Sequence, residues 1–215
     1  MRQLTVCLCL ASATLNARSA AARPENAPAI DAQPEHAWSC SLALAVYIVP
    51  DSHEYVQPTV EADHGPLHLE ARYNYEALDT ASIFVGWNCS VGEELVFDFT
   101  PMIGLVFGDA SGIAPGFETA LTWKQIEFYA EAEYFLDSDS RDDRFFYLWS
   151  ELSWRPADCF RVGIAGQRTR AYSSDVDIQR GPLVGVTLEN LDLTAYVFNL
   201  DEGDPTFVFA ATFGF

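Results

Sequence analysis

Carboxylates are the most abundant side chains in this sequence that could do chemistry. The chain has 31 Asp and Glu residues against 12 Lys and Arg, which gives a formal net charge of −19. Many of these charges alternate with apolar residues, so an extended chain gathers them on one face. A confined group of such charges can attract cations, hold a polar ligand, form an internal salt-bridge network or act as a catalytic pair. The candidates at such positions are Glu70, Arg72, Asp98, Glu118, Glu131, Glu133, Glu151, Arg155 and Arg161.

Recognised catalytic motifs are missing from the sequence. The chain has only four His residues. His53 follows Ser52, but no acid stands at a fixed spacing to orient the pair. Neither Gly-x-Ser-x-Gly, nor His-Glu-x-x-His, nor a phosphate-binding loop occurs. The sequence therefore predicts no catalytic residue and gives no support to an enzyme.

Spacings typical of metal and cofactor sites are missing as well. The sharpest charge cluster is the segment 137–144, where Asp residues follow one another at Asp-x-Asp spacing. An EF-hand needs Gly at its sixth position and an acid at its twelfth, and Asp142 and Leu148 stand there instead. We expect a solvated acidic loop, with loose binding of divalent cations as the alternative. No metal site and no cofactor is predicted.

The N-terminal segment has the features of an export signal. Residues 1–22 contain a basic start, an apolar core over 4–15 and a run of small residues at the end. The core is too short for a transmembrane helix. We predict a signal peptide over 1–22 and a flexible, Pro-rich periplasmic linker over 23–37. Whether any two of the three cysteines beyond this segment form a disulfide is left open; they are Cys40, Cys89 and Cys159.

The rest of the chain alternates with a period of two. The clearest segment is 67–76, in which Leu67, Leu69, Ala71, Tyr73 and Tyr75 share one face and the intervening polar residues share the other. A helix would mix these two sets, whereas a strand separates them. We predict a single all-β, antiparallel domain over 38–215. Its roughly twelve strands are 38–49, 54–63, 67–76, 81–89, 93–107, 113–123, 126–136, 144–155, 159–170, 177–188, 191–200 and 205–215.

Composition and charge exclude two classes of protein. Hydrophobic residues make up 49% of the chain, with 15 Phe, 9 Tyr and 5 Trp. So many large apolar side chains exclude disorder for the bulk of the chain. The strong negative charge repels a phosphate backbone, so we expect no nucleic-acid partner.

Three features favour a barrel with its apolar face outward. The strands are about ten residues long, as a tilted strand needs to cross a bilayer. Every second connection is longer and more acidic, and an even number of strands would put both termini on the side of the short turns. Aromatic residues gather near strand ends, as in an interfacial belt: Trp38, Tyr55, Tyr75, Trp87, Phe107, Trp123, Trp154 and Tyr172. A soluble secreted barrel, with its charges outward, is the competing interpretation.

These residues resemble those of bacterial outer-membrane β-barrel proteins. The chain ends in Phe215, with Phe207, Phe209, Ala211 and Phe213 at alternate positions before it. This is similar to the C-terminal assembly signal of that class. The resemblance covers about residues 38–215, and it implies an up-and-down transmembrane barrel with both termini in the periplasm. It also implies outer-membrane lipid, lipopolysaccharide and the barrel-assembly machinery as partners. It implies no particular activity.

Inside such a barrel, the charged residues would line the lumen. We expect Asp98, Glu118, Glu131 and Glu151 to form one acidic wall on four consecutive strands, with Arg72 and Arg161 facing it. A narrow porin-like channel for small solutes or cations is the function that we predict. A closed structural barrel and an outer-membrane lipid-modifying enzyme are the alternatives.

Overall fold

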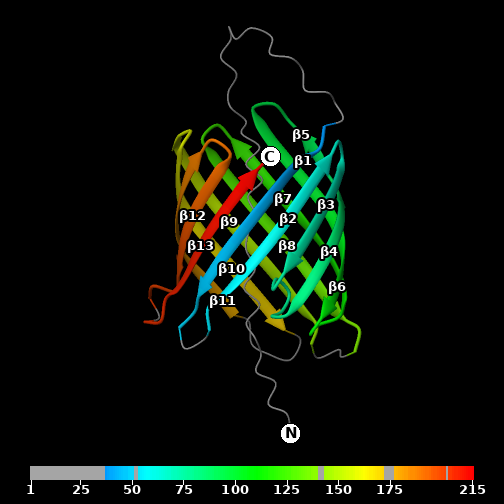
Figure 1. Ribbon diagram of the computed structural model, residues 1–215. Coiled ribbons are helices and arrows are strands. Elements are labelled where there is room, and N and C mark those ends of the chain that lie inside the picture. The colour runs from blue at the N-terminus through cyan, green and yellow to red at the C-terminus, as the bar shows by residue number, and fades with distance from the viewer. Residues whose placement is uncertain (1–36, 51–52, 140–142, 172–176, 202) are drawn as a thin grey trace.

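A computed structural model describes residues 37–50, 53–139, 143–171, 177–201 and 203–215. These residues form an all-β barrel that is closed around its axis (Figure 1). Within the described ranges, no helix is long and apolar enough to span a membrane. The strands are β1 (Ser39–Ile48), β2 (Tyr55–His64), β3 (Leu67–Tyr73), β4 (Thr80–Trp87), β5 (Cys89–Val91), β6 (Leu95–Gly108), β7 (Gly112–Trp123), β8 (Ile126–Asp137), β9 (Phe145–Ala157), β10 (Phe160–Ala171), β11 (Asp177–Leu188), β12 (Leu191–Phe198) and β13 (Thr206–Gly214).

The topology is an antiparallel meander in which neighbours in sequence pair with each other. Pairing of β1 with β13 joins the two ends of the chain, and pairing of β4 with β6 completes the circle. The short β5 follows β4 after Asn88 and pairs with the same strand, β6. The two segments therefore occupy one position, and the described barrel has twelve strands, as the alternation predicts.

The two ends of the barrel differ in their connections. At one end, tight turns join the strands, and the residues between β7 and β8 and between β11 and β12 include Lys124 and Glu189 at φ 55° and 53°. Positive φ at a central residue gives a two-residue hairpin its twist. The start of β1 and the C-terminus lie at this short-turn end, at the top of Figure 1, where Cys40 and Phe215 exchange two backbone hydrogen bonds. The connections at the opposite, long-loop end are generally longer.

The barrel is apolar outside and largely polar inside. On the outer surface, side chains such as Leu105 and Ile164 are 57% and 62% exposed. Charged side chains such as Arg72 and Glu131 lie inside and are 3% and 1% exposed. A soluble barrel would have the opposite arrangement. The distribution thus favours the inside-out barrel over the soluble one.

Tryptophans form a band on the outer surface at the short-turn end. Trp38, Trp87, Trp123 and Trp154 lie there near strand termini, and each is about half exposed. An amphipathic indole suits the boundary between hydrocarbon and water. These four residues, and Phe107 at the opposite end, lie outward near strand termini, as the predicted belt requires.

The belt prediction is wrong for two tyrosines. Tyr55 is half-buried inside the barrel and stacks on Tyr47, and Tyr75 is buried. The strand predicted over 67–76 ends at Tyr73, because Asn74 adopts φ 57° and reverses the chain. This turn breaks the alternation and folds Tyr75 into the barrel. Tyr172 lies outside the described residues.

Several predictions fall outside the described residues. The signal peptide over 1–22 and all but the last residue of the linker over 23–37 lie there, as do parts of the acidic loop 137–144. Among the described residues, Cys40, Cys89 and Cys159 are free thiols.

Candidate functional site: the barrel lumen

Aromatic side chains fill the lumen toward the long-loop end. Tyr47, Tyr147 and Phe198 are at most 2% exposed. The Trp149 ring makes edge-on contacts with Tyr196 and Phe198, with ring centroids 5.3 and 5.5 Å apart. These rings come from strands β1, β9 and β12, so they meet only because the barrel closes. They form an aromatic layer across this half of the lumen.

Arg72 lies next to this layer and ties two sides of the lumen together. Its Nε and Nη2 each donate a hydrogen bond of 2.7 Å to the carboxylate of Glu70, which lies two residues earlier on β3. Its Nη1 lies 2.9 Å from Glu131 and 3.2 Å from Glu133, both on β8. The hydroxyl of Tyr75 donates to Glu131 as well. One guanidinium thus holds three carboxylates.

Two aromatic rings fix the position of this guanidinium. Its central carbon lies 4.0 Å from the ring centroid of Tyr75 and 4.3 Å from that of Phe84. Both rings are desolvated, where a cation–π contact is strongest. Arg72 is therefore a fixed constriction of the lumen.

A second network surrounds Arg161 on β10. Its Nη1 donates to Glu151 at 2.9 Å, and its Nη2 donates to the hydroxyl of Thr194 at 2.7 Å. Glu151 also accepts hydrogen bonds from Trp149 at 3.0 Å and from Tyr196 at 2.8 Å. This Arg161 network therefore satisfies Glu151 without any contribution from Arg72.

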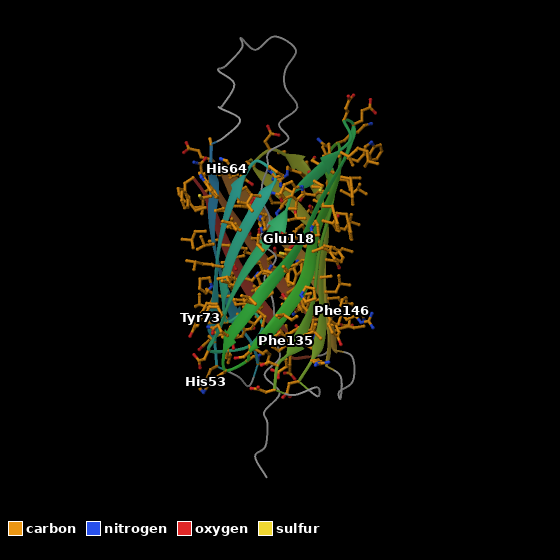
Figure 2. The ribbon with its side chains drawn as sticks, turned by 90° about the vertical axis from the view of Figure 1, so that its right-hand side faces the viewer. His53, His64, Tyr73, Glu118, Phe135 and Phe146 are labelled. Carbon is orange, nitrogen blue, oxygen red and sulfur yellow. The ribbon has the colours of Figure 1, made fainter. Side chains whose placement is uncertain are left out.

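Three carboxylates approach one another closely in a third group, which we call the carboxylate triad. It consists of Glu61 on β2, Glu70 on β3 and Glu118 on β7, and one oxygen from each lies within 4.8 Å of the others. Glu61 and Glu70 stand directly opposite each other in the pairing of β2 with β3. Glu118 reaches them from across the lumen, about halfway along the barrel (Figure 2).

A cavity of about 260 Å³ lies between the triad and the short-turn end. Its walls include Asp63, Asp98, Glu118 and Glu127, so it is acidic. Tyr129 also lines it. This acidic cavity gives small polar species a space that reaches Glu118.

The structure divides the predicted site residues among these groups. Glu70, Arg72, Glu131 and Glu133 lie in one network, and Glu151 and Arg161 lie in the other. Glu118 and Asp98 line the cavity. Arg155 is half-buried near the short-turn end, where its Nη1 lies 3.4 Å from the Thr187 hydroxyl.

The four predicted wall carboxylates do not form one wall. Glu118 and Glu131 are direct partners between β7 and β8. Glu151, in contrast, stands opposite Tyr129, and Asp98 stands opposite Ala120. The registers of the strands offset these carboxylates along the barrel axis, which strand order alone does not reveal.

Sequence reasoning missed Glu61, Tyr129 and Trp149. Glu61 belongs to an alternating run over 55–64 that carried the necessary signal, with Val60 and Ala62 on the other face. Tyr129 and Trp149 also alternate with outward residues, but an aromatic ring fits either face of such a strand. Only the structure assigns these two rings to the lumen.

The histidines and the ends of the barrel add three local features. His68 points into the lumen, where its Nδ1 lies 2.9 Å from Asp63, and the ring of His64 packs on Trp38. In the loop after β3, burial raises the pKa of Glu76. At the long-loop end, a hydrogen bond from Arg180 lowers the pKa of Asp201 in solvent.

Comparison with known proteins finds solved structures that are similar to this chain in fold. No family model matches this chain, and no curated protein matches its sequence. The structure described as KdgM porin matches with a TM-score of 0.64 over 81% of this chain and 99% of that chain, at 8% identity. The fold is that of the outer-membrane β-barrels.

Two further structures match this chain at similarly low sequence identity. A structure of KdgM porin in complex with disordered oligogalacturonate also gives a TM-score of 0.64, at 9% identity and the same coverage. OccK5 (OpdH) from Pseudomonas aeruginosa is 7% identical over 80% of this chain and 62% of that chain, with a TM-score of 0.44. At such identities, the likeness to KdgM concerns the fold and leaves the ligand of this chain open.

Proposed function

We propose that this chain is a narrow, cation-preferring channel of the bacterial outer membrane. The observation that carries the proposal is the charge of the lumen. Among the described residues, nine buried carboxylates face two buried arginines and one buried histidine. A low-dielectric wall focuses such a charge excess, which attracts cations and repels anions.

The same charge argues against an acidic solute. The match described as KdgM porin in complex with disordered oligogalacturonate holds a chain of uronic acids. The excess of carboxylates around the triad and the acidic cavity would repel such a chain. We therefore propose that this barrel differs from that porin in the sign of the charge that it admits.

We further propose that the short-turn end faces the periplasm. Long outer loops and short periplasmic turns are usual for this class of barrel. Outer-membrane lipid and lipopolysaccharide would contact the apolar outer surface. The outward residues Phe207, Phe209 and Phe213 of the closing strand, with Phe215 directly after it, would be the segment that the assembly machinery binds.

A closed structural barrel is the second candidate, and a specific observation favours it. The aromatic layer and Arg72 fill the lumen with side chains that are at most 3% exposed. Ions can pass only where these side chains move aside. If the barrel is a channel, the same filling of the lumen predicts small conductance steps rather than those of an open porin.

Recordings in a planar lipid bilayer distinguish these two candidates. The refolded protein is added to the bilayer in symmetric salt with a chelator. Discrete steps of small amplitude support the channel. A protein that inserts, as shown by protection of its strands from protease, but stays electrically silent is a closed barrel, and the proposal of a channel is then wrong.

The lipid-modifying enzyme has less support than either barrel. Such an enzyme needs a His beside a Ser on the outer wall. His68 instead points inward and His64 packs on Trp38 at a strand end. Absence of enzyme activity stays a prediction, and an assay with labelled phospholipid tests it.

A further inference from the structure

The carboxylate triad places three buried carboxylates together, and its ion pairs with Arg72 and with the His68 imidazole go to Glu70. Glu61, Glu70 and Glu118 are 2%, 4% and 7% exposed. Two acids directly opposite in a sheet, as Glu61 and Glu70 are, destabilise it. The ion pairs of Arg72 go to Glu70, Glu131 and Glu133 rather than to Glu118.

Unsatisfied polar atoms point to a missing ligand at the same place. The Oε1 atom of Glu118 is buried and has no hydrogen-bond partner among the described residues, and the same is true of the Tyr129 hydroxyl. Both side chains line the acidic cavity. A buried carboxylate oxygen without a partner is costly, so native proteins normally satisfy it with a donor, water or a cation.

We propose that the carboxylate triad binds one hard divalent cation, with Ca²⁺ as the best match. Glu61, Glu70 and Glu118 would each supply an oxygen ligand, and Ca²⁺ prefers carboxylate oxygens. The triad itself offers oxygen ligands, which suit a hard cation better than a softer metal. The nearby imidazole of His68 lies 3.9 Å from Glu70 through its Nε2. The acidic cavity would give the ion access from the short-turn end.

A site built from three carboxylates suits calcium better than magnesium. Ca²⁺ holds its ligands at about 2.3–2.6 Å, so opposite ligands in its shell lie about 4.6–5.2 Å apart. Mg²⁺ holds them at about 2.0–2.1 Å and keeps several waters. The triad oxygens, all within 4.8 Å of one another, are close enough to reach one ion of this size together. Water from the cavity would complete the coordination.

Such an ion would tie β2 and β3 to β7 across the lumen. These strands are not neighbours in the sheet, so the bound cation would act as a cross-link in the half of the barrel without the aromatic layer. It would also offset the charge excess there. The proposal goes beyond the proposed function, because a conducting barrel and a silent one could both hold this ion.

Calorimetric titration of CaCl₂ into the protein tests the site. The full chain is refolded in a neutral detergent, stripped with a chelator and compared with two variants. Wild type should show one saturable site per chain, and Glu118→Gln should weaken its Kd at least tenfold. Glu127→Gln is the matched control, because Glu127 lines the same cavity outside the triad. It should bind as wild type does.

Two results would overturn the proposal. One is a wild-type titration with no saturable site, and the other is Glu118→Gln binding with the wild-type Kd. If Glu118→Gln does not refold, Glu61→Gln replaces it in the same comparison. Because the titration needs no bilayer, an electrically silent barrel that binds calcium refutes the channel and leaves the calcium site intact.

Discussion

Arg72 and Arg180 represent two opposite environments for an arginine in this barrel. Arg72 is buried among three carboxylates and two aromatic rings. Arg180 pairs with Asp201 in solvent, where the two side chains are 74% and 61% exposed. Removing one partner of a buried pair leaves an uncompensated charge, whereas an exposed pair is screened by water.

Arg72→Met should therefore lower the free energy of unfolding by about 3–5 kcal/mol. Arg180→Met, the matched control, should leave it unchanged. Urea unfolding of both variants in lipid vesicles, followed by Trp fluorescence, measures the difference. Equal stability of the two variants would show that the Arg72 network does not hold the lumen together.

Alternation predicted which residues face inward but not which residues meet. The alternation of polar and apolar positions along β3 predicts that Glu70 and Arg72 face the lumen. Their contacts with Glu131 depend on barrel closure and register, which no local pattern encodes. Tyr75 departs from the alternation, because the positive φ of Asn74 ends the strand before it.

Strands β4 and β6 pack closely against each other in the barrel wall at one glycine. Phe84 on β4 lies over Gly104 on β6, its direct partner, and supports the guanidinium of Arg72 from one side. A Cβ atom at Gly104 would come within 2.5 Å of the Phe84 ring. The position thus requires glycine so that the ring can lie flat against the neighbouring strand.

Gly104→Ala should lower the free energy of unfolding by about 1–3 kcal/mol, because the ring must move. Gly166→Ala is the control, since a Cβ atom there meets its nearest neighbour at an ordinary 3.7 Å. Unfolding in urea compares the two variants. A stable Gly104→Ala protein would mean that Phe84 has another position available, contrary to the packing described above.

The strands themselves were predictable, apart from irregular points. Period-two runs and turn residues located the strands to within a few residues. The interruption between β4 and β5 was missed, because the side chain of Asn88 forms its own contacts. It donates to Asp63 at 2.6 Å and accepts from Thr100 at 2.7 Å.

The barrel as a whole is apolar outside and polar inside, which is the reverse of a soluble barrel. Substitutions on its outer surface can therefore test for lipid contact. Phe209 lies outward in mid-strand and is 50% exposed, while Phe213 lies outward near the short-turn end. An arginine costs most at the middle of a bilayer and least near its surface.

Phe209→Arg should therefore lower the free energy of unfolding by about 2–4 kcal/mol in lipid vesicles, and Phe213→Arg by about 0–1 kcal/mol. Reversible unfolding in vesicles of matched thickness measures both values. A soluble barrel would tolerate arginine at either outward position, so two small effects would refute the placement in a membrane.

The sign of the ion preference tests the central proposal most directly. We would measure the reversal potential of the refolded protein in a planar bilayer under a KCl gradient, with a chelator present. The lumen charge predicts a reversal potential toward that of K⁺, reduced in Glu118→Gln, because this substitution removes one carboxylate from the acidic cavity. A reversal potential toward that of Cl⁻ would contradict the account.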